Sequence, residues 1–370
     1  MKIPLVNLKI QYESIKDEIN KAVEKVLKSS NFILGQEVEK LEKEIAGYCG
    51  CKYAIGVASG TDGLLLSLMA YNISNGDEVI TSPFTFIATA EVVAFLGAKP
   101  VFVDIEPGTF NIDVSKIEEK INKKTKAIIP VHLFGHSVDM DQIIDIAKQY
   151  NLPVIEDAAQ AIGAEYKGKR VGAFGDIGAL SFFPSKNLGS YGDAGMVLTN
   201  DEDIAKKIKM LRTHGSDVKY VHQFIGINAR LDELQAAILR VKLKHLDGWT
   251  LKRIGNAKFY TELLKDLDVV TPIEKEGCKH VYNQYTIRIK DRDKLREFLE
   301  KEEISTAIHY PKPLHLQEAF KFLAHKERDF PISEMVAKEV LSLPIYPELT
   351  QEQIEDIVIK IKSFFLNKGV

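Results

Sequence analysis

The sequence predicts an α/β protein: a large domain with a mostly parallel central sheet flanked by helices, followed by a smaller C-terminal α+β domain. The chain has 370 residues, and at about 100–200 residues per domain this length suits two domains. From Tyr53 to Leu198, short β-branched segments alternate with helix-like segments, which is the pattern of βαβ units. After Trp249 this regular alternation ends.

The first element is predicted to be a helix over Glu13–Lys28, because Ile15, Ile19 and Val23 recur at helical spacing. Seven strands are then expected where short apolar runs occur, at Ala54–Val57, Glu78–Thr81, Lys99–Val103, Lys126–Val131, Pro153–Glu156, Ala179–Phe183 and Gly195–Leu198. Helices are expected between the strands, near Thr61–Tyr71, Thr85–Leu96, Asp113–Ile121 and Asp139–Tyr150.

A long amphipathic helix is predicted from Arg230, because Leu231, Leu234 and Ile238 recur at three- and four-residue steps. The domain boundary is placed near its end, so that the predicted domains are residues 1–245 and 246–370. In the second domain we expect a strand and two helices, at Tyr285–Ile289, Asp293–Lys301 and Thr350–Phe365.

Composition argues against several classes of protein. The chain has 49 basic and 52 acidic residues, a net charge of −3, whereas nucleic-acid binders are usually basic. No run of about 20 apolar residues could cross a membrane, and no signal peptide is recognisable, so a cytoplasmic protein is expected. Three cysteines, Cys49, Cys51 and Cys278, are too few for a disulfide framework or a structural zinc site, and no metal is expected.

The segment Ala58–Gly63 follows a predicted strand and opens a predicted helix. Glycine lets the backbone approach a ligand closely, and the free N–H groups of a helix N-terminus attract anions. The segment is therefore a candidate phosphate site, or equally a capped helix start. By contrast, Gly163–Arg170 matches the sequence motif of a nucleoside-triphosphate-binding loop only in part, because it ends in arginine rather than serine or threonine. It is interpreted as a turn.

Two further features carry chemistry when taken together. Glu156 and Asp157 end an apolar strand, and such strand ends form the ligand crevice of an open α/β sheet. A buried carboxylate there needs a partner, although Asp157 could instead cap a helix. Lys186 follows the next strand, within Ser181–Gly189. A phosphate site, a carboxylate and a lysine are the three features that pyridoxal phosphate requires.

With these features the chain resembles the DegT/StrS-type sugar aminotransferases, pyridoxal-phosphate enzymes with the aspartate-aminotransferase (type I) fold. The resemblance extends over nearly the whole chain and rests on ordered segments: Phe32–Gly35, Ser59–Thr61, Phe84–Thr89, Val131–Gly135, Glu156–Gln160, Ser181–Gly189, Gly226–Arg230 and His309–Pro311.

The resemblance implies a role for each matching residue at the cofactor ring. Lys186 matches the lysine that forms the Schiff base, and Asp157 matches the partner of the pyridine nitrogen. Gln160 matches the residue beside the ring hydroxyl. Phe86 matches the aromatic residue that stacks on the ring; packing in the core is the alternative.

The resemblance also implies a phosphate site shared between two subunits of a homodimer. Gly60, Thr61 and the Ser181 hydroxyl match its parts in one subunit, although Ser181 could instead cap a turn. Asn228 matches a residue donated by the other subunit, and asparagine is common in turns in any case. Lys219 could cross the interface with Asn228 and meet the diphosphate or sugar, or remain a solvated loop lysine.

His309 and Tyr310 precede Pro311 in a proline-rich stretch and could line the sugar pocket or form a structural turn. Relatives with histidine in place of the lysine remove a sugar hydroxyl, so Lys186 favours transamination, with glutamate as the donor and a nucleoside-diphosphate keto-sugar as the acceptor.

The segment Asn228–Leu243 is most similar to the branch that aminates C3 of 3-keto-6-deoxy sugars, and the C4-aminating branch is the alternative. Phe183 stands where many relatives have tyrosine. A non-catalytic sensor of the same fold and a type I enzyme for amino acids alone are the other hypotheses, and the intact Lys186, Asp157 and Gln160 argue against the sensor.

Overall fold

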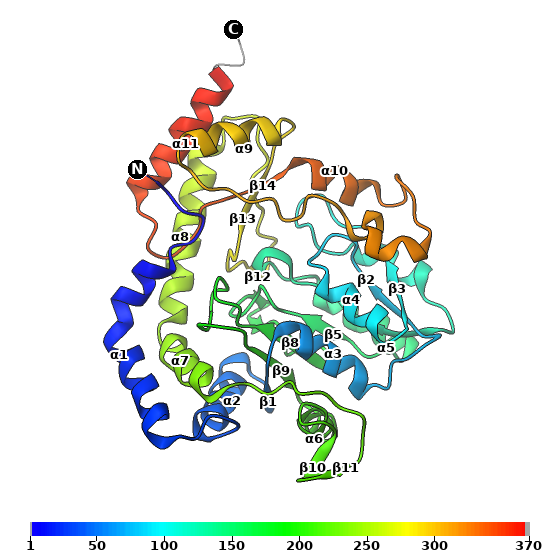
Figure 1. Cartoon of the computed structure of the whole chain (residues 1–370). Coiled ribbons are helices and arrows are strands. Elements are labelled where there is room, and N and C mark those ends of the chain that lie inside the picture. Colours follow the sequence, from blue (N-terminus) through cyan, green and yellow to red (C-terminus); the bar gives the residue numbers. More distant parts are fainter. Residues whose placement is uncertain (1, 367–370) are drawn as a thin grey trace.

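The computed structural model describes residues 2–366 and is built around one continuous sheet (Figure 1). Two sheets, in the orders β1-β9-β8-β5 and β3-β2-β4, are joined by parallel bridges between Ile128 and Val154 and between Val131 and Asp157. Only β9 runs against the other strands. The strands are β1 (Tyr53–Val57), β2 (Glu78–Thr81), β3 (Lys99–Phe102), β4 (Thr125–Ile128), β5 (Ile155–Asp157), β8 (Ile177–Ser181) and β9 (Gly195–Thr199). The predicted, mostly parallel sheet is confirmed.

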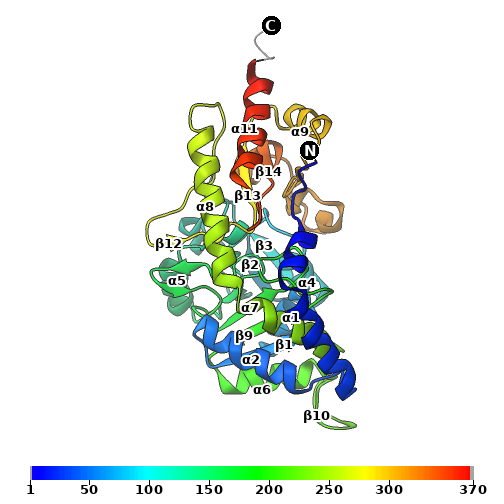
Figure 2. The same ribbon diagram turned by 90° about the vertical axis from the view of Figure 1, so that its left-hand side faces the viewer.

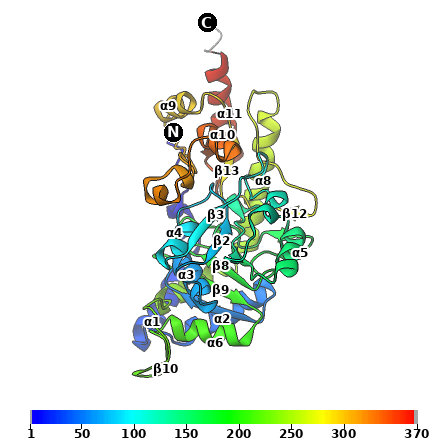
Figure 3. The ribbon, with the colours of Figure 1, turned by 90° about the vertical axis from the view of Figure 1, so that its right-hand side faces the viewer.

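Helices cover both faces of this sheet, as Figure 3 shows for α3 and α4 on one side of the strands and α5 on the other. Alternating side chains of a strand point to opposite faces. In β9, Val197 packs with α3, α4 and α6, whereas Met196 and Leu198 pack with α2 and α7. The helices are α2 (Gln36–Cys49), α3 (Gly60–Ala70), α4 (Ala88–Phe95), α5 (Met140–Tyr150), α6 (Glu202–Leu211) and α7 (Glu233–Leu243).

The C-terminal part of the chain has a hydrophobic core of its own. Residues of α8, α11 and the antiparallel pair β13–β14 form it together with Ile3, from the start of the chain. Figure 2 shows α8 and α11 side by side, with α1 running along α7. The elements are α1 (Leu8–Ser29), α8 (Leu246–Leu264), β13 (Tyr285–Arg288), α9 (Arg292–Lys301), α10 (Pro331–Glu339), β14 (Val340–Leu343) and α11 (Gln351–Leu366). The predicted division into residues 1–245 and 246–370 remains a prediction.

Two predicted helices differ from the structure. Residues Asp113–Ile121 form two single 3₁₀ turns, Val114–Lys116 and Glu118–Lys120, instead of one α-helix. Val114 and Ile117 are buried, but the charged residues after them face solvent, so a longer helix would have little apolar surface to bury. The helix predicted from Arg230 begins at Glu233, because the preceding residues are extended and form β-bridges, such as Arg230 with Val57.

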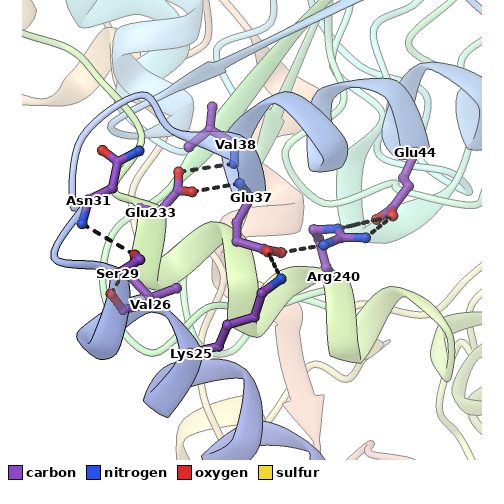
Figure 4. A network of polar contacts seen from close by, with 9 residues as sticks. All are labelled: Lys25, Val26, Ser29, Asn31, Glu37, Val38, Glu44, Glu233 and Arg240. Carbon is purple, nitrogen blue, oxygen red and sulfur yellow. Dashed lines mark hydrogen bonds and ion pairs between the residues drawn. The ribbon is translucent and has the colours of Figure 1, made fainter.

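Helices α2 and α7 are joined by a polar network at the edge of the large sheet (Figure 4). The Glu233 side chain is buried and accepts three backbone N–H groups at the start of α2, from Gly35 (2.9 Å), Glu37 (2.6 Å) and Val38 (3.2 Å). These N–H groups have no acceptor within their own helix. Arg240, two turns further along α7, binds the carboxylates of Glu37 and Glu44. The network fixes the start of α7, which follows directly after the segment that carries Asn228.

Each helix within residues 2–366 is either too short or too polar to cross a lipid bilayer.

The hairpin that follows α6 is formed by β10 (Ser216–Val218) and β11 (Val221–His222). It projects from the large sheet, at the end of the molecule opposite α9 and α11 (Figure 1). Another hairpin, β6 (Glu165–Tyr166) with β7 (Lys169–Arg170), confirms that Gly163–Arg170 is a turn.

Candidate active site

A cavity of about 440 Å³ opens at the carboxyl ends of β5 and β8. The carboxyl ends of parallel strands meet at the same edge of a sheet, where open α/β proteins bind their ligands. Most of the residues singled out from the sequence line this one cavity: Gly60, Thr61, Phe86, Asp157, Gln160, Ser181, Lys186, His309 and Tyr310.

One corner of the cavity is the N-terminus of α3. The Ser59 hydroxyl accepts the Asp62 N–H (3.0 Å) and donates to the Asp62 carboxylate (2.8 Å), which caps the helix. The N–H groups of Gly60 and Thr61 have no acceptor among residues 2–366. A Cβ at position 60 would lie 2.8 Å from the Cβ of Ser181, so glycine is needed for this close approach. The corner offers two free N–H groups at a helix N-terminus, which is a site suited to an anion such as phosphate.

Ser181, at the end of β8, borders the same corner. Its Oγ accepts the N–H of Phe183 (3.3 Å), so it caps a turn, while its O–H remains able to donate into the cavity. Phe183 also lines the cavity and is 52% exposed. Phe183 therefore presents an apolar phenyl ring, without a hydroxyl, to the cavity.

Asp157 ends β5 and its carboxylate is buried at the cavity wall. One oxygen accepts the Thr89 hydroxyl (2.7 Å) and the other accepts the Ala159 N–H (3.2 Å). Burial raises the pKa of Asp157, although the Thr89 hydrogen bond and the charge of Lys186 oppose that shift. No ion pair reaches this carboxylate from the part of the chain that the structure describes. It is therefore suited to a cationic ligand atom.

Glu156, the preceding residue, has a structural role on the other face of the strand. Its fully buried carboxylate accepts Nε2–H of His132 (2.9 Å), whose Nδ1 accepts the Val138 N–H and so fixes this tautomer. Burial raises the pKa of Glu156, but its hydrogen bonds outweigh burial and hold that pKa below the usual value. Three backbone N–H groups complete the set, from Gly172, Phe174 and Gly175, each 2.7 Å away.

Lys186 lies in a tight turn after β8, where its N–H donates to the Phe183 carbonyl (2.8 Å). Its Nζ lines the cavity and forms no hydrogen bond or ion pair with any of residues 2–366. Burial lowers the pKa of Lys186 to about 8, and the charge of Asp157 opposes that shift. The turn is held from behind by Lys242 of α7, whose Nζ donates to the Gly189 carbonyl (2.6 Å). An amine of lowered pKa, free of partners, is suited to act as a nucleophile.

Gln160 and Tyr310 form a connected pair on the facing wall. The Gln160 side chain accepts the Phe134 N–H (2.7 Å) and donates to the Tyr310 hydroxyl (3.0 Å). The Phe86 ring lies 6.3 Å from the Tyr310 ring and is 53% exposed. Phe86 is therefore an exposed aromatic surface in the cavity and does not belong to the core.

His309 is fixed beside these residues by a hydrogen bond between its Nδ1 and the Ser342 hydroxyl (2.8 Å). Burial lowers the pKa of His309 to about 4, and the charge of Lys186 adds to that shift. Burial also raises the pKa of Tyr310 above its usual range. Both side chains are therefore neutral near pH 7.

Asn228 and Lys219 do not line this cavity. Asn228 borders a neighbouring cavity of about 500 Å³, and Asp193 borders both. Lys219 lies on the β10–β11 hairpin, beside a third cavity of about 480 Å³ that Arg212 and Arg230 also line. Three residues in or beside the first cavity were not predicted from the sequence: Thr89, Asp193 and Gln284. The four-residue spacing of Thr85 and Thr89 is a sequence signal for this pair. In the structure their hydroxyls lie 3.1 Å apart.

The three cysteines are free: Cys49 is buried, whereas Cys51 and Cys278 are only half-buried.

A sequence model of the DegT/DnrJ/EryC1/StrS aminotransferase family matches residues 13–362. A pleiotropic regulatory protein of Geobacillus stearothermophilus is 52% identical over 368 residues, 99% of each chain. A UDP-N-acetyl-3-dehydro-alpha-D-glucosamine 3-aminotransferase of Acidithiobacillus ferrooxidans is 47% identical over 361 residues, 97% of each chain.

Two solved structures are similar over nearly the whole chain. DesV of S. venezuelae, in complex with a ketimine intermediate, superposes with a TM-score of 0.96 at 41% identity and 98% coverage of both chains. NtdA of Bacillus subtilis, with bound cofactor PMP, superposes with a TM-score of 0.88 at 35% identity, over 94% of this chain and 82% of the other.

Proposed function

Because this chain belongs to the DegT/DnrJ/EryC1/StrS aminotransferase family, we propose that it transfers the amino group of glutamate to the C3 keto group of a nucleoside-diphosphate-linked 6-deoxy hexose. The chain is a pyridoxal-phosphate-dependent nucleotide-sugar aminotransferase. The choice of C3 is supported by the Acidithiobacillus relative, which is named as a 3-aminotransferase. Glutamate is the donor that the family resemblance implies.

One observation carries the proposal. A lysine of lowered pKa, a buried carboxylate without an ion-pair partner and a helix N-terminus with two free N–H groups share one cavity. These donors and acceptors fit pyridoxal phosphate. Gly60, Thr61 and Ser181 would hold its phosphate, Asp157 its ring nitrogen and Lys186 its aldehyde carbon. The exposed face of Phe86 would lie against the ring, and Gln160 beside the ring hydroxyl. When bound, the cofactor supplies a ring that withdraws electrons from the carbon carrying the amine.

The side chains around the cavity can perform the remaining tasks. Lys186 Nζ, as the neutral amine, can attack a carbonyl carbon, and when free it can take a proton from the substrate carbon and return it. Thr89 fixes one Asp157 oxygen by its 2.7 Å hydrogen bond and so orients the carboxylate. His309 and Tyr310, both neutral and both fixed by hydrogen bonds, are proposed to orient the sugar.

The two half-reactions test this function directly. Glutamate added to the purified holoenzyme should change the visible absorbance of the bound cofactor, and a nucleotide 3-keto-sugar should restore it. A clean preference for a 4-keto-sugar would overturn the choice of C3 but not the aminotransferase activity. An absorbance that responds to neither substrate would instead support a ligand-binding regulator.

We further propose that two subunits complete each site. Within one chain Asn228 and Lys219 lie outside the cofactor cavity. The hairpin region that carries Lys219 exposes large apolar side chains, including Tyr220 (82%) and Ile225 (91%). Such a surface is costly to leave in water, and a second copy of the chain would cover it. Asn228 and Lys219 would then reach the partner's phosphate and sugar.

Replacing Lys219 with alanine is expected to raise KM for the nucleotide sugar while leaving the glutamate half-reaction nearly unchanged, because glutamate has no diphosphate. A lost charge-assisted hydrogen bond of about 1.5–3 kcal/mol corresponds to a rise of roughly 10- to 150-fold. Steady-state kinetics with each substrate varied will measure it. Lys206→Ala, which removes an exposed lysine paired with Glu202 on α6, is the matched control and should change neither KM.

Subunit mixing then tests whether Lys219 crosses the interface. Co-expressed Lys186→Ala and Lys219→Ala chains should regain activity, because one site of each mixed dimer would contain both wild-type residues. If each site is built from a single chain, every site carries a lesion and mixing restores nothing. Equal damage to both half-reactions in Lys219→Ala would place this lysine on the cofactor and not on the sugar.

A further inference from the structure

Gln284 carries a side-chain amide that the fold does not use. Its Oε1 is shut off from solvent and has no hydrogen-bond donor among residues 2–366. Its Nε2 donates to no residue in that range and, unlike Oε1, is not shut off from solvent. Burying a polar group without a partner lowers stability. A buried polar group that no residue of the fold satisfies can be satisfied by a ligand or by water.

Gln284 borders the cofactor cavity. Gln284 directly precedes β13 and lines the 440 Å³ cavity together with Lys186, His309 and Tyr310. On its other side lies a cavity of only about 10 Å³, which is far too small for a substrate. A ligand large enough to contact this amide therefore approaches it from the cofactor cavity.

The backbone around Gln284 is held rigidly against the site. The Asn283 N–H donates to the Phe134 carbonyl (2.9 Å), and the Phe134 N–H in turn donates to the Gln160 side chain (2.7 Å). The Asn283 side chain also donates to that of Asn187 (3.0 Å), the residue after Lys186. The segment is thus tied both to Gln160 and to the lysine turn. An amide held in this way is preorganised for a ligand.

We propose that Gln284 binds the sugar substrate, through a hydrogen bond from its Nε2–H to a hydroxyl oxygen on the hexose ring. This inference rests on the proposed function, in which a nucleotide-linked hexose is the amino acceptor. A hydroxyl oxygen can accept this N–H. Because a glutamate carboxylate also accepts an N–H, the two half-reactions measured below distinguish the sugar from the amino donor.

Replacing Gln284 with leucine, which is similar in size and apolar, gives the sharpest test. A sugar hydroxyl left without its partner should lower kcat/KM for the nucleotide sugar roughly 5- to 150-fold, while the glutamate half-reaction stays within about twofold of wild type. The midpoint of thermal unfolding of the cofactor-free protein should stay the same or rise, because leucine removes an uncompensated polar group. If leucine disturbs the packing, Gln284→Met, which is unbranched, should still lower kcat/KM for the nucleotide sugar and spare the glutamate half-reaction.

Thr261→Val is the matched control for a structural hydrogen bond. The Thr261 hydroxyl bonds with that of Tyr285 and with the Ala257 carbonyl, and Thr261 does not line the cavity. This variant should lower the unfolding midpoint and leave both half-reactions unchanged.

Two results would overturn the role of Gln284. A fall in the unfolding midpoint of Gln284→Leu and Gln284→Met, like that of Thr261→Val, would show that the amide is structural. A loss confined to the glutamate half-reaction would assign it to the donor. If the wild-type enzyme aminates no nucleotide keto-sugar, the proposed function fails by itself, whereas the unfolding comparison still decides whether the amide is structural.

Discussion

Replacing Lys186 with alanine is expected to abolish amino transfer and leave the fold intact. The cavity contains no other lysine among the residues that the structure describes, so no second amine can take over both the covalent bond and the proton transfer. Losing these functions should lower kcat by at least about 10⁴-fold, or about 5.5 kcal/mol in the barrier. Single-turnover absorbance and steady-state product formation will measure the loss, and circular dichroism will check the fold.

Lys52→Ala, which removes an exposed lysine on the surface of the large sheet, is the control and should keep wild-type activity. The Lys186→Ala protein should still bind the cofactor without a covalent bond, because the phosphate contacts at Gly60, Thr61 and Ser181 remain. Turnover within a hundredfold of wild type would mean that a different lysine carries the chemistry.

The lowered pKa gives the lysine a further signature in the cofactor-free protein. Because burial lowers the pKa of Lys186 to about 8 from its ordinary 10.5, the folded chain holds this proton less tightly than the unfolded chain does. The lysine therefore costs stability below about pH 8, and the cost disappears as the pH rises toward 10.5. The free energy of unfolding of wild type relative to Lys186→Met should rise over this window and be flat below it.

The second large effect is expected at Asp157. Asp157→Asn keeps the shape of the side chain and can keep the hydrogen bond from Thr89, but it removes the negative charge that would face the cofactor ring nitrogen. A fall in kcat of about 10²-fold or more, near 3 kcal/mol, is expected. The loss of cofactor affinity should be smaller, because the phosphate contacts are untouched. Cofactor titration and steady-state kinetics will separate the two.

Glu156→Gln serves as the comparison one residue away. Its carboxylate points to the other face of the strand and does not line the cavity, so the substitution should lower stability and spare kcat. A near-normal kcat for Asp157→Asn would mean that Asp157 is only a structural group.

The seven strands of the large sheet were predicted from local patterns, whereas helices α2, α6, α8 and α10 were not. The runs at Glu78–Thr81 and Gly195–Leu198 were recognised because short apolar segments between turn-forming residues are typical of buried strands. The order of the strands in the sheet was not predicted, because each pairing joins segments far apart in the sequence, such as β1 with β9. The helix expected over Asp113–Ile121 was wrong, because tertiary packing buries only two of its apolar residues.

In the active site, too, local features were predictable from the sequence, whereas contacts between distant segments were not. Asp157 and Ser181 could be placed together from the sequence, because the ends of parallel strands converge. The different orientations of Glu156 and Asp157 follow from strand alternation once β5 is located. Gln284 was not predicted, since its place in the cavity depends on how the segment before β13 folds back onto Phe134. No pattern near Gln284 in the sequence shows this contact.

Borohydride reduction of the holoenzyme, followed by proteolysis and peptide mapping, will identify the lysine that binds the cofactor. This reagent makes the bond between the cofactor and its lysine permanent, so the labelled peptide identifies the residue without reference to activity. We expect a single label on Lys186, in the peptide that contains Ser181–Gly189. A label on any other lysine would contradict it and would move the active site away from this cavity.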